Sequence, residues 1–218
     1  ATLTNFGHDN QLTDRWVSFL VERALGGTGL LISEIIAVDP EALAQQAIVT
    51  GFDDLNLSGF KATAAGVHKA GGALIGQLWH PGRQQLWHPS KSPMGVSEQP
   101  DPLSWTVPHV MSTTQVNRVI TAYIDTAKRL CRCGFAGIEL HGAHGYLIGQ
   151  FRSPWSNTRD DEFGGDIDGR TRFARHIANG IRAECGNDFI IGLKMPGEEG
   201  VAGGIDTDEA EQLTRRLA

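Results

Sequence analysis

The sequence is poor in cysteine and has no long hydrophobic run. Three cysteines in 218 residues are an odd number, which argues against a disulfide framework and predicts reduced thiols in the core of a cytoplasmic protein. The longest apolar stretch, residues 29–38, is interrupted by Ser33 and Glu34, so we expect no segment that spans a bilayer. The first residues have neither a basic start nor an apolar core, and we expect no secretory signal.

An excess of basic residues is also absent. Nineteen Lys and Arg against 25 Asp and Glu give a net charge of -6, with a pI near 5.7. This balance argues against nucleic acid or an anionic membrane as the main partner. A chain of this length suits one domain that buries roughly 70% of its unfolded surface.

Short apolar runs alternate with helical patterns along the chain. Continuous runs of this length are typical of strands buried on both faces of a parallel sheet, and we expect them at 29–36, 73–79, 136–140 and 189–193. Helical spacing of apolar residues predicts helices at 13–25, 57–69, 113–133, 171–184 and from 206 to the end. A capping box, Ser112 to Gln115, precedes the longest helix, and Asp206 with Glu209 predicts a similar cap.

Strand followed by helix, repeated, predicts either a doubly wound sheet or a (β/α) barrel. No GxGxxG follows a strand, so the main mark of a dinucleotide-binding sheet is missing. The apolar runs end instead in polar residues, which a barrel gathers on the face that carries the active site. These strand-end residues are Asn5, Glu34, Gln77 with His80, His141 with His144, and Lys194.

The segment His141-Gly142-Ala143-His144-Gly145-Tyr146 is the strongest candidate site. Small residues between the histidines leave room beside the rings, and residues three apart in a turn lie on one side. His141 and His144 could therefore grip one atom, while Tyr146 could give or take a proton. An isolated HxxH is weak evidence, and its position at a strand end is what raises its value.

Two long connections follow the strands that carry these residues. Residues 80–112 hold six prolines, Trp105 and a second Trp-His-Pro at 87–89, which suits a rigid lid or substrate wall, with contact to a partner as the rival interpretation. Residues 142–170 mix charges with paired glycines and predict an ordered, internally bonded loop that braces the site.

The motif HGAHGYLIGQF, followed by SPWSNTRDDEFGG, Arg170 and Arg172, resembles the Old Yellow Enzyme family of flavin-dependent NAD(P)H oxidoreductases. The segments 1–4, 29–34 and 77–83 are similar to the ends of the family's first three strands. The resemblance implies an FMN-binding (β/α)8 TIM barrel. This chain would hold about the first five βα units and be incomplete at both ends, with the strands six to eight that complete the phosphate site missing.

The resemblance also implies a cofactor site. Thr4 would lie near the flavin edge, the backbone at Ile35 near the pyrimidine, and the Gln77 amide on ring oxygen and nitrogen. His141 would also contact the flavin. Lys194 stands where the family usually has arginine, so it keeps the charge that stabilises reduced flavin but loses the planar fork.

By the same resemblance, His141 and His144 would hold the carbonyl oxygen of an unsaturated substrate and Tyr146 would supply the proton. NADH or NADPH would be the reductant, and the motif style is similar to the 2,4-dienoyl-CoA reductase branch, some of whose members carry a 4Fe-4S cluster in a later segment. The substrate would be a small unsaturated carbonyl compound. Whether the protein forms a homo-oligomer is left open.

Three alternatives stay open at this point. The first is an amine-oxidising flavin dehydrogenase of the same fold. The second is a metal-dependent barrel hydrolase that uses His80, His141, His144 and Glu34, although Gln77 and Lys194 are poor ligands at central positions. The third is a non-catalytic barrel fragment whose exposed sheet edges would promote association.

Overall fold

A computed structural model describes residues 3–85 and 92–217, and its centre is a five-stranded parallel sheet. The strand order is β2-β1-β3-β6-β7, with every neighbouring pair parallel. The strands are β1 (Leu30–Ala37), β2 (Val49–Thr50), β3 (Ala73–Trp79), β6 (Gly137–His141) and β7 (Ile190–Lys194). The four predicted strands are thus confirmed, and the two-residue β2 is one that the sequence pattern did not indicate.

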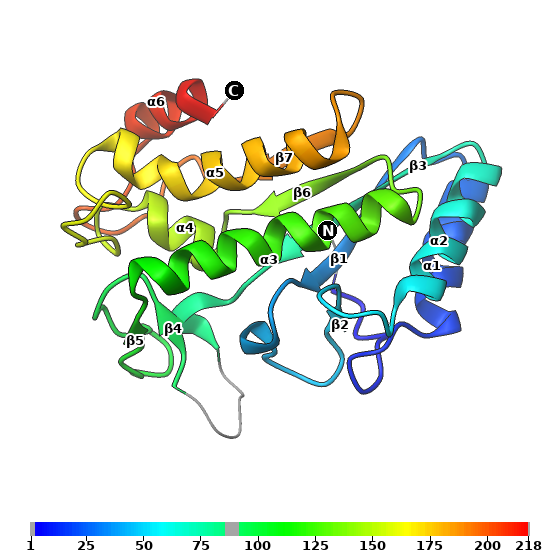
Figure 1. The fold of residues 1–218 in the computed structure, drawn as a ribbon, viewed down its shortest axis with the longest axis horizontal. Coiled ribbons are helices and arrows are strands. Elements are labelled where there is room, and N and C mark those ends of the chain that lie inside the picture. The colour runs from blue at the N-terminus through cyan, green and yellow to red at the C-terminus, as the bar shows by residue number, and fades with distance from the viewer. Residues whose placement is uncertain (1–2, 86–91, 218) are drawn as a thin grey trace.

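Helices cover one face of the sheet. Figure 1 shows α3 and α5 running side by side over the strands, while α1 and α2 pack together beyond the C-terminal end of α3, at the right of the view. The helices are α1 (Asp14–Leu25), α2 (Leu57–Lys69), α3 (Thr113–Arg132), α4 (Leu147–Arg152), α5 (Ile167–Cys185) and α6 (Thr207–Leu217). All five predicted helices are confirmed; α5 begins four residues earlier than expected because the Asp166 side chain accepts a hydrogen bond from the Gly169 N–H.

The capping expectations are also confirmed. Ser112 accepts from the Gln115 N–H at 3.3 Å, and the Gln115 side chain accepts from the Ser112 N–H at 2.9 Å. Asp206 accepts from the Glu209 N–H at 2.8 Å. Each bond satisfies a backbone donor that the first helical turn leaves free, so these residues fix where α3 and α6 begin.

The core lies between the sheet and its helices. Alternate residues of β3 and β6, such as Leu78 and Ile138, point at α3 and are completely buried together with its Leu130. At Gly76 a Cβ atom would lie 2.5 Å from the Leu130 side chain, so glycine allows α3 to approach β3 closely. The opposite, inward-facing side of the strands is thereby left for polar residues.

The cysteine prediction is only partly right. All three cysteines are free, and Cys133 is buried, but Cys131 and Cys185 are half-buried rather than in the core.

Within the described residues, no helix is both long and apolar enough to cross a bilayer.

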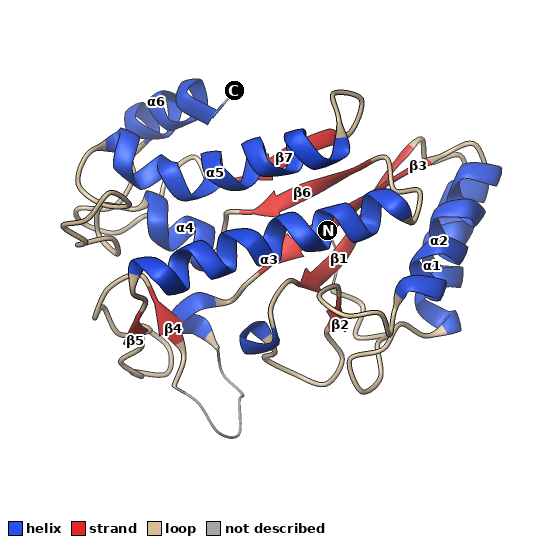
Figure 2. Cartoon of the chain, in the orientation of Figure 1, coloured by secondary structure: helices blue, strands red, loops and turns tan. Residues whose placement is uncertain are grey.

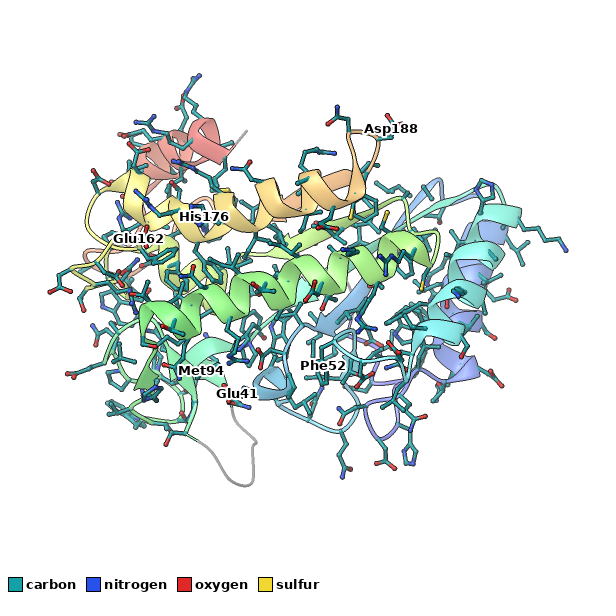
Figure 3. The ribbon with its side chains drawn as sticks, viewed as in Figure 1. Glu41, Phe52, Met94, Glu162, His176 and Asp188 are labelled. Atoms are coloured by element: carbon teal, nitrogen blue, oxygen red, sulfur yellow. The ribbon has the colours of Figure 1, made fainter. Side chains whose placement is uncertain are left out.

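The described parts of the connection at residues 80–112, residues 80–85 and 92–112, contact the body of the protein. They contain a 3-10 turn η2 (Gly82–Gln84) and a small sheet of β4 (Met94–Gly95) with β5 (His109–Val110), drawn in red at the lower left of Figure 2. Arg118 of α3 anchors both this connection and the 3-10 turn η1 (Pro40–Ala42), since its guanidinium contacts Glu41 and the Met94 sulfur. Figure 3 labels these two partners, close together beneath α3. The second Trp-His-Pro, at 87–89, lies outside the described residues.

The connection at residues 142–170 is internally bonded, as predicted. Asn157 donates to the carbonyls of Phe151 and Phe163, and Arg159 forms an ion pair with Asp161. The segment also contains the short helix α4, which the sequence pattern did not indicate. Its bonds fix the position of α4 directly after the candidate turn.

Candidate functional site

The inward-facing side of three adjacent strands carries polar side chains at its carboxyl end. Because strand side chains alternate, the residues next to the core-facing Leu78 and Leu140 point the other way. The register pairs Gln77 with Glu139 and His141 with Lys194, so the inward-facing polar residues of β3, β6 and β7 are neighbours. The C-terminal strand ends of a barrel are where active sites form.

The turn after β6 brings three rings together. The His141 ring centroid lies 5.1 Å from that of His144 and 4.9 Å from that of Tyr146, and the last two are 6.2 Å apart. Tyr146 also packs edge-on against Trp79 at 5.3 Å. The expectation that the two histidines and the tyrosine share one locus is confirmed geometrically, whereas their chemical roles stay a prediction.

Burial shifts the pKa of two members of this cluster, His141 and Tyr146. It lowers the pKa of His141 to about 4, with smaller contributions from the nearby His144 and Lys194 charges. The neutral ring accepts a hydrogen bond at Nδ1 from the Ala143 N–H, which places its proton on Nε2. Burial also raises the pKa of Tyr146. At neutral pH the cluster therefore offers N–H and O–H donors.

Close packing and side-chain amides hold the turn. Gly142 donates to the Lys194 carbonyl at 2.8 Å, and a Cβ atom at Gly142 would lie only 3.0 Å from that oxygen. Gln84 donates to the His144 carbonyl at 2.9 Å, and Gln150 donates to the Gly145 carbonyl at 2.7 Å. His144 itself is exposed and has a left-handed backbone, with φ of 59°. No local sequence pattern indicated Gln84 or Gln150, because both act across loops.

Two expected cofactor residues are engaged within the chain. The Gln77 amide donates to Glu139 at 2.5 Å. Sequence reasoning missed Glu139, although its position two residues before His141 in one strand gives it the same orientation. Thr4 lies outside any strand and donates to Glu34 from both its backbone N–H, at 2.6 Å, and its hydroxyl, at 2.8 Å.

Ile35 and Lys194 complete the expected set. Ile35 is half-buried beside Trp79, directly after an irregularity in the pairing of β1 with β3. Lys194 is half-buried at the end of β7, and no described residue forms a hydrogen bond or ion pair with its ammonium group. A partly desolvated cation without a partner calls for an acceptor or an anion.

The donor set fits a flavin ring. An isoalloxazine presents carbonyl oxygens and ring nitrogens along one edge; the strand ends offer an amide at Gln77 and an ammonium at Lys194, and the N-terminal segment offers a hydroxyl at Thr4. Gly192, next to Lys194 on the inward side, adds no side chain to this face. The individual contacts of these residues with FMN stay predictions.

His80 does not join the site. It is 1% exposed, its Nδ1 accepts from the Gly82 N–H at 3.0 Å, and burial lowers its pKa to about 4. Among the described residues, no group of three or more His, Cys, Asp or Glu side chains could hold a metal ion. The ligand set of the metal-hydrolase alternative, His80 with His141, His144 and Glu34, is therefore not brought together.

Comparison with known proteins identifies the family. The model of the NADH:flavin oxidoreductase / NADH oxidase family matches residues 2–217. This chain belongs to that family. An NADH oxidase from Thermoanaerobacter brockii is 35% identical over 96% of the chain, and an N,N-dimethylglycine/sarcosine dehydrogenase from Chromohalobacter salexigens is 33% identical over 92% of it.

A solved structure supports the same assignment. The chain superposes on a 2-naphthoyl-CoA reductase in complex with 2-naphthoyl-CoA with a TM-score of 0.93, at 27% identity and over the whole chain. The fold class is thus that of a TIM barrel, of which this chain is a part. It spans 33% and 30% of the two relatives and 35% of the solved chain, about a third of each.

Proposed function

We propose that the protein containing this chain is an FMN-dependent ene-reductase, which takes hydride from NADH or NADPH and delivers it to an alkene activated by a carbonyl group. The observation that carries the proposal is the cluster of His141, His144 and Tyr146, whose rings lie within 6.2 Å of one another. The cluster lies at the same strand ends as the Lys194 ammonium, which has no hydrogen-bond or ion-pair partner among the described residues. Family membership supports the flavin and the nicotinamide.

The histidines would act on the substrate oxygen. FMN, when bound, supplies the hydride that reaches the β-carbon, and negative charge then develops on the carbonyl oxygen. The Nε2–H of neutral His141 and a ring N–H of His144 would donate to that oxygen. Donors already aimed at a developing oxyanion are each worth about 3 to 4 kcal/mol of barrier, by analogy with oxyanion holes.

Tyr146 would then protonate the α-carbon. Its hydroxyl carries the proton at neutral pH because burial raises the pKa of the phenol. Its ring packs edge-on against that of Trp79, with the centroids 5.3 Å apart. A positioned proton donor of this kind contributes about 10² to 10⁴ in rate.

The cofactor would be held by the inward-facing strand ends. Lys194 would balance the charge of the reduced ring, Gln77 would bond its edge in place of Glu139, and Thr4 with the Ile35 backbone would lie along the other side. These assignments rest on the donor types and on the register of β3, β6 and β7. The phosphate is expected at later barrel loops, outside this chain.

Amine oxidation is the second candidate, and one relative favours it. The dimethylglycine/sarcosine dehydrogenase matches this chain nearly as well as the NADH oxidase does. The carboxylate of dimethylglycine could accept from the same two imidazole donors, so the histidine pair suits both candidates. Ene reduction is favoured by Tyr146, because hydride removal from an amine needs no proton delivered to carbon, whereas reduction of an alkene does.

A two-step experiment tests the proposal on the full-length protein. First, the absorbance spectrum and an FMN titration should show one bound flavin per chain. Second, the flavin should be reduced anaerobically by NADH or NADPH and reoxidised by 2-cyclohexenone. A protein that takes up no FMN would refute the flavin assignment. Flavin reduction by dimethylglycine, with no reoxidation by the enone, would instead establish amine oxidation.

A further inference from the structure

A cleft lies directly beside His144, at the carboxyl ends of the parallel strands. The cleft, of about 340 Å³, opens between the turn after β6, α4, and the loops that follow β3 and β7. Gly142 and His144 form one wall, and Arg83, Arg152 and Trp155 are among the other lining residues. A substrate whose carbonyl oxygen is held by the histidines could extend into this cleft.

Arg83 presents free hydrogen-bond donors to the cleft. The side chain is 5% exposed and its guanidinium lies over the Trp155 ring, 4.7 Å from the centroid. Its Nε is buried without a partner, and within the described residues neither terminal nitrogen forms a hydrogen bond or an ion pair. The backbone of Arg83 is fixed by the Gln150 side chain, which accepts from its N–H at 3.3 Å.

Arg152 adds a buried charge beneath the same wall. It is 1% exposed, and only its Nη2 is bonded, to the Gly142 carbonyl at 2.8 Å. Its Nε and Nη1 have no partner among the described residues. Burial lowers the pKa of Arg152 to about 10 and also lowers the pKa of Arg83, because neither charge is adequately compensated.

Acidic residues near the cleft decide which ligand suits it. Asp101 and Glu199 both act on Arg83 through space, and Glu198 lies at the rim. The Asp101 Oδ2 accepts from the Leu103 and Ser104 N–H groups, while its Oδ1 is buried without a partner among the described residues. The Glu199 Oε2 accepts from the Ser153 hydroxyl and the Ile205 N–H. Neither carboxylate forms an ion pair with Arg83 within the described residues, and both would repel a doubly charged phosphate more strongly than a single carboxylate.

We propose that this cleft is a carboxylate subsite, in which the Arg83 guanidinium binds a carboxylate carried by the unsaturated substrate some bonds away from the carbonyl held at His141 and His144. The planar fork of arginine matches the two oxygens of a carboxylate. The Trp155 ring packs against the planar Arg83 guanidinium, and the buried positive charge of Arg152 raises the electrostatic potential in the cleft. The inference rests on the proposed function, since it extends the substrate from the histidine pair.

Matched ligands test the subsite in the full-length, FMN-loaded protein. The probes are 4-hydroxyphenylalkanoic acids with one to three methylene groups, whose phenol oxygen stands in for the substrate oxygen, together with their methyl esters. Calorimetric titration should show that the acid binds about tenfold to a hundredfold more tightly than its ester at one or more chain lengths, the effect expected of a hydrogen-bonded charge pair. The analogous alkyl phosphate should gain less than the acid.

Variants locate the effect. Arg83→Met should abolish the preference for acid over ester, and Arg83→Lys should retain part of it. Arg132→Met is the matched control, because it removes an exposed arginine on α3, away from the cleft. Equal binding of acid and ester by the unmodified protein, or a preference that survives in Arg83→Met, would refute the subsite. A stronger gain from the phosphate would refute the choice of carboxylate.

Failure of the underlying function has a different signature. The uncharged parent, 4-ethylphenol, tests only the histidine pair, and its binding should be weakened by His141→Ala but unchanged by Arg83→Met. If 4-ethylphenol does not bind the FMN-loaded protein at all, the proposed function fails. If it binds normally and only the acid preference is missing, the subsite alone fails.

Discussion

His80 and His141 both lie just after a core-facing leucine, Leu78 near the end of β3 and Leu140 near the end of β6. In both histidines burial lowers the pKa to about 4. Their surroundings differ. His80 is enclosed, with Nδ1 bonded to Gly82 and Nε2 without a partner among the described residues, and Asp39 is the strongest charge acting on it. His141 lies in a cluster of rings that includes the exposed His144. A shifted pKa alone therefore does not distinguish a catalytic histidine from a structural one.

The orientation of the side chain makes the difference. The register pairs Leu78 with Leu140, so the inward-facing residue that corresponds to His141 is Trp79, and His80 is one position further along. A one-residue offset in a strand turns a side chain to the other face. The comparison predicts that changes at His141 and its neighbours affect catalysis, whereas changes at His80 affect stability.

Tyr146→Phe should show the largest effect on catalysis. If Tyr146 protonates the α-carbon, the variant keeps flavin reduction by NAD(P)H nearly intact but loses about 10² to 10⁴ in the rate of reoxidation by an enone. A quinone, which needs no protonation at carbon, should escape most of this loss. Stopped-flow reoxidation with both acceptors measures the difference, and equal losses with the two would remove Tyr146 from the proton transfer.

His141→Ala should have the next largest effect, about 10² to 10³ in enone reoxidation, because it removes one donor to the developing oxyanion. Binding of phenols should weaken in parallel, and His144→Ala should act in the same direction. His80→Asn is the matched control, since the Asn oxygen can accept from Gly82 in place of Nδ1. It should leave reoxidation by enone unchanged in the folded protein. Equal losses from His80→Asn and His141→Ala would break the comparison.

The sequence alone predicted the four long strands, the main helices and the ring cluster, because these depend on local periodicity and on one compact motif. It did not predict Glu139 as the partner of Gln77, or Gln84 and Gln150 as supports of the turn. Gln77 with Glu139 and Gln84 with His144 are 62 and 60 residues apart, and Gln150 also bonds to Pro81 and Arg83, so no local pattern encodes these contacts. Thr4 shows the same limit, since its partner Glu34 is 30 residues away.

Acid sensitivity provides the third test. An unfolded histidine binds a proton near pH 6.5, whereas His80 in the folded protein does so only near pH 4. Above pH 6.5 both forms are neutral and the group has no effect, but as the pH falls from 6.5 to 4 the unfolded state is favoured by up to about 3 kcal/mol. His80→Asn should flatten this part of the pH dependence of the free energy of unfolding, measured with urea between pH 7 and 4.5. An unchanged slope would show that His80 is protonated normally.

Lys194→Met should have the smallest effect of these variants. It distinguishes the two histidines by their pKa values. Lys194 is paired in register with His141 and lowers the pKa of that ring, whereas it is not among the charges that act on His80. The variant should raise the pKa of His141 slightly and leave that of His80 unchanged, which ring-proton NMR can follow. If the ammonium also stabilises the anionic reduced flavin, loss of its charge should lower the flavin potential by tens of millivolts. This shift is a small part of the roughly 4 kcal/mol Coulomb interaction between two unit charges 4 Å apart at a dielectric constant of 20, because desolvation of the charges offsets most of that interaction. An unchanged potential in a flavin-loaded variant, together with a shifted His141 pKa, would place Lys194 beside the histidine but away from the flavin.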